Sequence, residues 1–220
     1  MKLVLAFSLI FIGFTAAFAQ NEQAPILEKD IAYKDWTLKG IRDGKELNLR
    51  DLTKNKKLVA VVYFAPWCHN WQHDAPMLVK LYDKYKADGF EIVAVGEYGT
   101  VDAMNASLDS FKVTFPAVYE SQSQSDLSTT AHYAYRQSTG DKRKWGSPYY
   151  VFVDPKKIDK RGDMLFTKTD IINGELIETE GEQYIRIKLG LPAVDTKLTS
   201  AGKNEIEVCD PDKPAPLKKP

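Results

Sequence analysis

Three runs of apolar residues stand out along the chain and predict the strands of a buried sheet. Residues 58–64 read LVAVVYF, residues 90–95 read FEIVAV and residues 149–153 read YYVFV. Runs of this length, rich in β-branched and aromatic residues and without regular polar alternation, are typical of strands buried on both faces. Shorter apolar segments at residues 115–119 and 164–167 predict two further strands.

In the segments between these strands, apolar residues recur at helical spacing. Apolar residues within 77–82 recur at helical spacing, so we expect a helix that begins at Cys68 and ends at Gly89. Further helices are expected over residues 101–111 and 182–189. Strands that alternate with helices in this way predict an α/β fold with a partly parallel, mixed central sheet flanked by helices.

The segments outside this pattern are assigned from turn signals and composition. Residues 31–49 alternate apolar and polar positions around Asp43-Gly44, which predicts an N-terminal hairpin. Residues 21–27 are expected to form a mobile leader, and the Pro- and Lys-rich residues 196–220 predict a flexible C-terminal tail. We therefore expect one folded domain over residues 28–195.

The first twenty residues have a different character from the rest of the chain. Lys2 is followed by an almost unbroken apolar run over residues 3–14, and Ala17-Phe18-Ala19 supplies small residues at the positions that a signal peptidase reads. Residues 1–19 therefore predict a secretory signal peptide, cleaved after Ala19. The alternative is a retained anchor, but the run is shorter than the roughly 20 residues of a membrane span. We expect an extracytoplasmic protein, periplasmic or secreted, without stable membrane insertion.

Composition narrows the function classes further. The chain has 220 residues, 30 basic and 30 acidic side chains, and no formal net charge, which argues against a generally basic nucleic-acid binder. A mean hydropathy of −0.35 excludes a protein that spans a membrane many times. Two cysteines are too few for a disulfide-stapled scaffold, so their chemistry rather than their number matters.

Cys68 is the first candidate for that chemistry. It follows a predicted buried strand by four residues and stands where the predicted helix begins. Helix N-termini present unpaired N–H groups and the positive end of the helix dipole, and both stabilise a thiolate. We therefore expect a lowered pKa and enhanced reactivity for Cys68. The alternative is a buried structural cysteine.

Motifs around this cysteine resemble those of the thioredoxin superfamily. The segment Phe64-Ala65-Pro66-Trp67-Cys68 is similar to the start of the active-site motif in thioredoxins and protein disulfide isomerases. Pro76 matches the proline that kinks their active-site helix, and Ser147-Pro148 resembles the cis-proline loop that faces their active-site cysteine. Residues 30–52 and 115–119 resemble the secreted TlpA/ResA-like, or redoxin, branch.

This resemblance spans roughly residues 28–190 and implies a thioredoxin-like fold with an N-terminal hairpin and a central insertion. It implies thiol–disulfide exchange with protein thiols or disulfides as partners, and no organic cofactor. Pro148 would shape the substrate groove, and Ser147, Trp67 and Trp71 would line it as substrate contacts. Tyr149 and Tyr150 are candidates for an aromatic rim around Cys68, but the pattern favours them as sheet residues with one ring buried.

The active-site motif departs from the family at one position. These oxidoreductases carry Cys-x-x-Cys, whereas the chain reads Cys68-His69-Asn70-Trp71 and places an indole where the second thiol belongs. A single thiol attacks a disulfide but does not release the mixed disulfide without another thiol. Two hypotheses stay open: an oxidoreductase with one active-site cysteine, and a redox-inactive binding or scaffolding module.

Cys209 is the only other cysteine and lies 141 positions downstream of Cys68. A tail that reaches Cys68 would make Cys209 a resolving thiol; otherwise it pairs elsewhere or stays free. Peroxiredoxins use a distant resolving thiol of this kind, but their reactive cysteine follows a threonine by three residues. Ala65 stands at that position, which argues against a peroxidase.

Asp74, six residues after Cys68, is the candidate proton shuttle. The TlpA/ResA-like branch usually has a glutamate at this position, and the alternative for Asp74 is a solvated helix carboxylate. Val62 stands where cytoplasmic thioredoxins have a buried aspartate, so that version of proton transfer is not expected.

A third function, copper or zinc binding, is suggested by two histidines near the cysteine. His69 and His73 are one helical turn apart and share a face, and with a Cys68 thiolate they would form a soft N/S ligand set. The alternative is a pair of solvent-facing polar side chains, and we expect that no metal is required.

Overall fold

The computed structural model describes residues 22–193. Its strands are β1 (Gln23–Ala24), β2 (Leu27–Lys34), β3 (Thr37–Gly40), β4 (Glu46–Asn48), β5 (Leu58–Phe64), β6 (Phe90–Gly96), β7 (Ala117–Tyr119), β8 (Tyr149–Val153), β9 (Met164–Ile172) and β10 (Glu175–Leu176). Its α-helices are α1 (Leu49–Leu52), α2 (His69–Tyr85), α3 (Val101–Ser110), α4 (Ala131–Thr139) and α5 (Glu178–Leu189). Short 3-10 helices cover Lys86–Asp88 and Gln124–Thr129.

Eight strands form one mixed sheet in the order β2-β9-β8-β5-β6-β7-β3-β4. The pairs β5–β6 and β6–β7 are parallel, whereas β5–β8, β8–β9 and β2–β9 are antiparallel. The predicted α/β class with a mixed sheet is confirmed. The predicted N-terminal hairpin is also present, because β3 and β4 pair antiparallel across the turn that contains Gly44.

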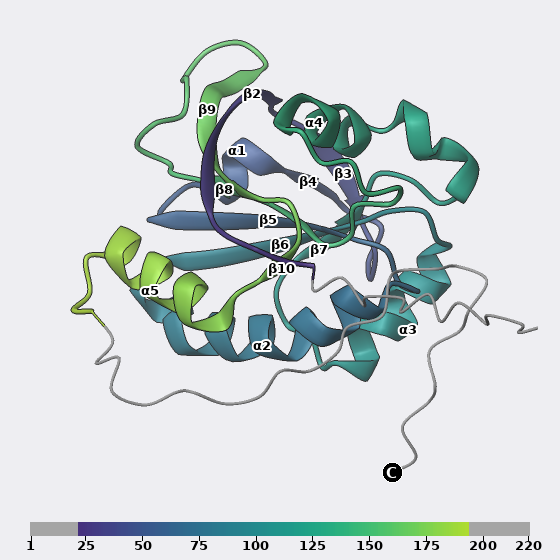
Figure 1. The fold of residues 1–220 in the computed structure, drawn as a ribbon, viewed down its shortest axis with the longest axis horizontal. Helices are drawn as coiled ribbons and strands as arrows, with labels where there is room; N and C mark the ends of the chain where they lie inside the picture. Colours follow the sequence, from purple (N-terminus) through teal and green to yellow (C-terminus); the bar gives the residue numbers. More distant parts are fainter. Residues whose placement is uncertain (1–21, 194–220) are drawn as a thin grey trace, which may run out of the picture.

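Strand β5 lies at the centre of the sheet and supplies both cores. Leu58, Ala60, Val62 and Phe64 point to the core formed with α2, α3 and α5, and the alternate residues point to the core formed with α4 and α1. Figure 1 shows the two helical layers on opposite sides of the sheet. All seven β5 side chains are buried, as the continuous apolar run predicts.

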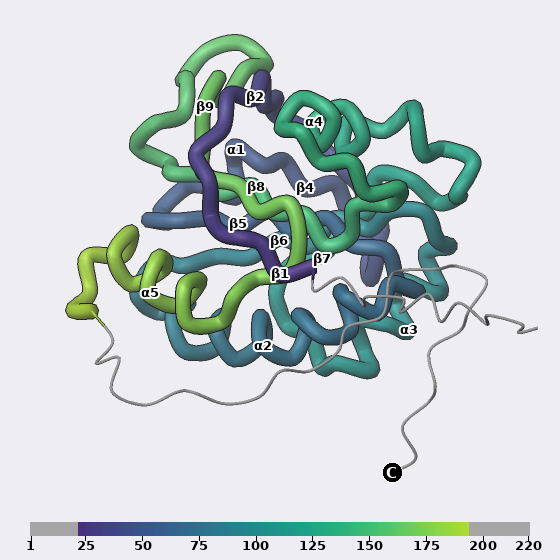
Figure 2. The backbone as a smooth tube through the Cα atoms, in the orientation of Figure 1, coloured from purple at the N-terminus to yellow at the C-terminus, as the bar shows by residue number. Residues whose placement is uncertain are grey.

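The chain start departs from the sequence prediction. Residues 21–27 were expected to be a mobile leader, but β1 pairs in parallel with β10 and Leu27 already belongs to β2. Figure 2 shows β1, the purple start of the described chain, beside the segment that leads into α5. Two-residue strands carry too little pattern to be recognised in a sequence.

Three elements are missing from the prediction or longer than predicted. Helix α4 was not predicted, because two of its buried positions are the polar His132 and Arg136 and its apolar stripe is therefore interrupted. Strand β9 continues to Ile172, and α5 begins at Glu178 rather than at residue 182.

No helix among residues 22–193 has the length and apolar character of a membrane span. The expected signal peptide (residues 1–19) and tail (residues 196–220) lie outside the described residues.

Candidate functional site

Cys68 lies at the junction between the central strand and the longest helix. It is the N-cap residue of the 17-residue helix α2, as the sequence predicts, and its backbone is extended (φ −78°, ψ 124°). Its amide donates to the carbonyl of Ala65 at 3.0 Å, and its own carbonyl accepts from the amide of Gln72 at 3.1 Å. The sulfur therefore lies at the positive end of the α2 dipole.

The loop before β8 closes over this junction. The Ser147–Pro148 peptide bond is cis, as the resemblance implies. The Ser147 hydroxyl accepts a hydrogen bond from the amide of Ala65 at 2.9 Å, and the Ser147 carbonyl oxygen lies 3.1 Å from the Cys68 sulfur. The predicted residues Cys68, Ser147 and Pro148 are thus brought together from two distant parts of the chain.

The Cys68 sulfur is inaccessible in this state. Cys68 is fully buried and disulfide-bonded, and no cysteine among residues 22–193 carries a free thiol. Its predicted partner, Cys209, lies outside the described residues. The lowered pKa expected for the Cys68 thiol therefore stays a prediction for the reduced protein.

Trp71 points into the core and not toward a groove. Its exposed fraction is 0%, its indole packs on Phe64 with ring centroids 4.4 Å apart, and its Nε1 donates to the hydroxyl of Ser107 at 3.0 Å. A side chain buried in this way does not reach a substrate, so the expected role of Trp71 as a substrate contact is wrong for this state. Tyr149 and Tyr150 are both buried in the sheet, where the sequence led us to expect one buried ring.

Trp67 has partners that fix its indole beside the cysteine. Its Nε1 donates to the carbonyl of Tyr98 at 2.9 Å, and its ring meets Trp145 edge-on at 5.2 Å between centroids. Trp67 is only partly buried and remains the candidate substrate contact on this side. Trp145, two residues before Ser147, was missed because an isolated indole in a polar loop carries no spacing signal.

Asp74 is fully buried, which excludes the solvated helix carboxylate as its environment. The hydroxyl of Tyr150 and the amide of Leu176, the latter at 3.0 Å, both donate to its Oδ2. Burial raises the pKa of Asp74, although His73 and the two donors act in the opposite direction. The proton-shuttle role of Asp74 stays a prediction.

His73 lies between the carboxylate of Asp74 and a second buried carboxylate, that of Glu175. The Nδ1 atom of His73 lies 3.1 Å from Oε2 of Glu175 and 3.6 Å from Oδ1 of Asp74. These contacts, first with Asp74 and then with Glu175, raise the pKa of His73 to about 10, while burial raises the pKa of Glu175. Sequence reasoning missed Glu175, because it lies a hundred positions downstream in a two-residue strand.

This cluster differs from the expected soft metal set. Within residues 22–193, the His, Cys, Asp and Glu side chains whose ligand atoms gather within 4.8 Å are His73, Asp74 and Glu175. Cys68 and His69 are not part of that group. Both ring nitrogens of His69 are buried instead, and they have no hydrogen-bond partner within residues 22–193.

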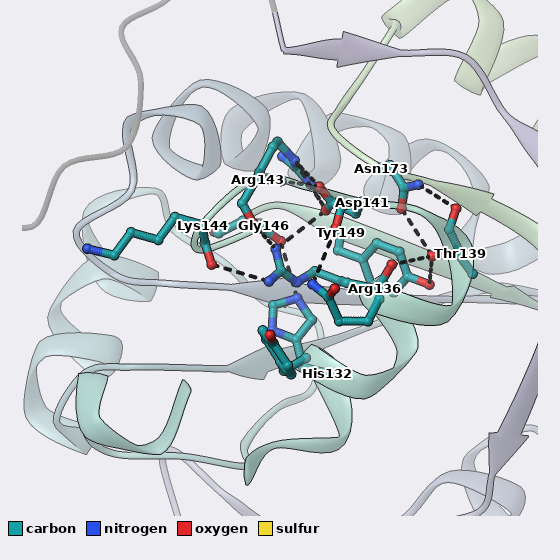
Figure 3. Close-up of polar contacts among 12 residues, drawn as sticks. His132, Arg136, Thr139, Asp141, Arg143, Lys144, Gly146, Tyr149 and Asn173 are labelled. Carbon is teal, nitrogen blue, oxygen red and sulfur yellow. Dashed lines mark hydrogen bonds and ion pairs between the residues drawn. The ribbon is translucent and has the colours of Figure 1, made fainter. Parts of the chain in front are cut away.

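The loop that carries Ser147 is held in place by helix α4. The Arg136 guanidinium donates to the carbonyls of Arg143 at 2.9 Å and Lys144 at 3.3 Å, and Figure 3 shows it enclosed by this loop. Arg143 in turn donates to the carbonyl of Pro148 at 2.9 Å. A ring nitrogen of His132 lies 3.2 Å from the carbonyl oxygen of Gly146.

A family model matches more than half of the chain. Residues 30–161 match the AhpC/TSA family, a span that runs from β2 past β8 and includes Cys68 and Pro148. The chain belongs to the AhpC/TSA family. The AhpC/TSA match ends before β9, β10 and α5, so Glu175 lies beyond it.

Curated relatives of this AhpC/TSA chain are thiol–disulfide oxidoreductases named ResA. The protein from Oceanobacillus iheyensis is 34% identical over 92 residues, which cover 40% of this chain and 47% of that protein. The one from Bacillus subtilis is 30% identical over 82 residues, covering 37% and 45%. The chain thus matches less than half the length of these relatives.

Solved structures support the same fold for this AhpC/TSA chain. A thiol:disulfide interchange protein DsbE from Chlorobium tepidum, described as putative, superposes with a TM-score of 0.51 at 23% identity, covering 75% of this chain and 99% of that one. The MTB protein dsbF gives 0.51 at 19% identity, covering 70% and 94%. The predicted thioredoxin-like fold and the resemblance to TlpA/ResA-like redoxins are confirmed.

Proposed function

We propose that the chain is an extracytoplasmic thiol–disulfide oxidoreductase with one active-site cysteine, Cys68, and a distant resolving thiol, Cys209. The observation that carries the proposal is the position of the Cys68 sulfur, at the N-terminus of α2 and 3.1 Å from the Ser147 carbonyl of the cis-proline loop. The names of the ResA relatives support protein thiols or disulfides as substrates. The predicted signal peptide supports the location.

The chemistry follows from two successive exchanges. In the reduced protein the Cys68 thiolate attacks one sulfur of a substrate disulfide, a new S–S bond forms, and the second substrate sulfur leaves as a thiolate. The Cys209 thiolate then attacks the Cys68 sulfur and releases the first substrate sulfur as a thiolate. The substrate gains two electrons, the protein is left with a Cys68–Cys209 disulfide, and an external dithiol restores it.

The described residues each contribute a distinct part of this reaction. The α2 dipole stabilises the Cys68 thiolate before attack and when it serves as the leaving group. Pro148 and the backbone of Ser147 form the wall against which a substrate chain lies, and Trp67 forms the opposite side. The sulfur is buried in the disulfide state, so the proposal requires that reduction opens access to it.

A redox-inactive binding module is the second candidate, and the burial of Trp71 favours it. A thiol at position 71 would face the core. The indole instead fills that part of the core and donates a hydrogen bond to the hydroxyl of Ser107. In this case the cis-proline loop would hold a partner without forming a covalent bond.

Trapping of the mixed disulfide separates the two functions. The reduced C209S variant is mixed with a disulfide-containing protein substrate, and the products are separated without reductant. We expect C209S to accumulate a covalent adduct through Cys68, and C68S to form none. Adduct formation by C68S equal to that of C209S would refute the role of Cys68, and partner binding that persists without Cys68 would favour the binding module.

A further inference from the structure

Three side chains of ligand type converge where β10 meets helix α2. His73 and Asp74 are neighbours on α2, and Glu175 comes from β10 on the other side of the contact. Their candidate ligand atoms lie within 4.8 Å of one another. The two measured separations from His73 Nδ1 are 3.1 Å to Glu175 and 3.6 Å to Asp74.

Both carboxylates are buried, and three of their four oxygens lack a hydrogen-bond donor within the described residues. Both side chains have exposed fractions of 0%, and Oδ1 of Asp74 and both carboxylate oxygens of Glu175 accept no hydrogen bond within the described residues. The Nδ1 atom of His73 lies 3.1 Å from Oε2 of Glu175, and its raised pKa of about 10 gives the cluster one positive charge against two carboxylates. Buried carboxylates in this condition are costly unless a cation compensates them.

We propose that His73, Asp74 and Glu175 form a binding site for a divalent transition-metal ion, with Zn²⁺ as the best match. Zinc binds histidine nitrogen and carboxylate oxygen at about 2.0–2.2 Å in tetrahedral geometry, so neighbouring ligand atoms lie roughly 3.3–3.6 Å apart. The observed 3.1 Å and 3.6 Å bracket this separation. Metal binding displaces the proton that His73 carries in the metal-free protein, and the neutral ring with two carboxylates then balances the charge of a dication.

The surroundings hold the ligands as a metal site requires. The second oxygen of Asp74 accepts from Tyr150 and Leu176, which aims the first oxygen at the cluster. The amide of Glu175 donates to the carbonyl of Glu22 at 2.9 Å, so the β1–β10 pair fixes the backbone of the third ligand. The side chain of His73 is 43% exposed, which leaves the solvent side open for the ion and for a water as fourth ligand.

The site shares Asp74, the candidate proton shuttle, with the sulfur chemistry but contains neither cysteine. It uses neither Cys68 nor Cys209 and is present while Cys68 is disulfide-bonded. A bound ion would fasten β10 to the helix that begins at Cys68. The inference therefore stands whether or not the proposed oxidoreductase activity is found.

Zinc titration of the oxidised protein tests the site. The chain without residues 1–19 and without a polyhistidine tag is stripped with a chelator, checked for the absence of free thiols, and titrated with Zn²⁺ by calorimetry. We expect one equivalent to bind. H73A and E175Q are each expected to weaken binding by at least about tenfold, because each removes one ligand.

Two matched variants act as controls. H69A removes the neighbouring histidine and E178Q removes an exposed carboxylate three residues after Glu175, and both are expected to bind zinc as the parent does. The exposed position of His73 makes H73A informative even if E175Q fails to fold. Absence of stoichiometric binding, or equal affinity of H73A and the parent, would overturn the proposal.

Discussion

At the scale of single residues, Trp71 has the largest consequence for the chemistry. Its indole occupies the position of the second thiol in dithiol oxidoreductases, but it does so as a core residue packed on Phe64. The substitution therefore removes a thiol and at the same time adds a large apolar side chain to the core. Restoring the thiol cannot be neutral for stability.

Replacement of this residue tests its structural role. W71C would restore the dithiol motif, but we expect it to lower the free energy of unfolding by about 3–5 kcal/mol, because a buried indole is replaced by a small side chain. Urea denaturation followed by circular dichroism measures the loss. W71F, which keeps an aromatic ring against Phe64, should lose clearly less; a W71C protein as stable as the parent would show that the core does not depend on the indole.

Residue-level reasoning from the sequence was correct where one residue has one strong local role. Cys68 at the helix start and the cis bond before Pro148 followed from motifs that carry their own geometry. Asp74 was singled out because its position matches a glutamate of the TlpA/ResA-like branch, whereas its neighbour Glu175 was not recognised. The burial of Trp71 was not predicted either, since the same residue type is common both in rims and in cores.

At the scale of elements, the contact between α4 and the loop of residues 141–148 positions the cis-proline. Gly146 lies where the Arg136 guanidinium passes, and a Cβ on this glycine would lie 1.6 Å from Nη1 of Arg136. Its φ of +56° is in the left-handed region. Arg136 is fully buried and bonded to two carbonyls of the same loop, so it has little freedom to move aside.

A pair of glycine substitutions separates strain from packing in this loop. Gly140→Ala also places alanine at a positive φ, +87°, but its Cβ meets no atom of the described residues within 4 Å, so we expect a loss of roughly 1–2 kcal/mol. Gly146→Ala should lose about 1–3 kcal/mol more, because it displaces Arg136. Thermal unfolding of both variants provides the comparison. Equal losses would mean that the Arg136 contact does not support the loop.

The elements that could be predicted from the sequence are those with the strongest apolar pattern. The three continuous apolar runs became β5, β6 and β8, with boundaries within one residue of those expected. Helix α4 was missed because its buried residues include His132 and Arg136, whose burial depends on hydrogen bonds and, for His132, on a ring stacked on Tyr63. The β1–β10 pair was missed because its pairing is a tertiary contact between segments of two residues.

At the scale of the whole molecule, the connection between the two cysteines decides how the proposed cycle is completed. The thioredoxin-like fold places Cys68 but holds no second thiol within residues 22–193. Release of a substrate therefore depends on a thiol that lies outside the described residues or on another molecule.

Intact mass of the protein from an oxidising compartment tests this connection. After free thiols are blocked, we expect the unreduced chain without residues 1–19 to carry no adduct, and peptide mapping to link Cys68 to Cys209. Addition of a reductant before blocking should add two adducts. Two adducts without reduction would show that Cys68 and Cys209 are not linked, and the binding-module alternative would then be favoured.

The contacts of Glu22 also bear on how this protein meets its surroundings. Its carboxylate accepts from Asn70 in the first turn of α2 and from Arg143, whose guanidinium binds Pro148. Any segment joined just ahead of Glu22 therefore leaves the fold next to the cysteine end of α2. If residues 1–19 are the predicted signal peptide, we expect the cysteine end of α2 to face the membrane before cleavage, and cleavage after Ala19 to free it from the bilayer.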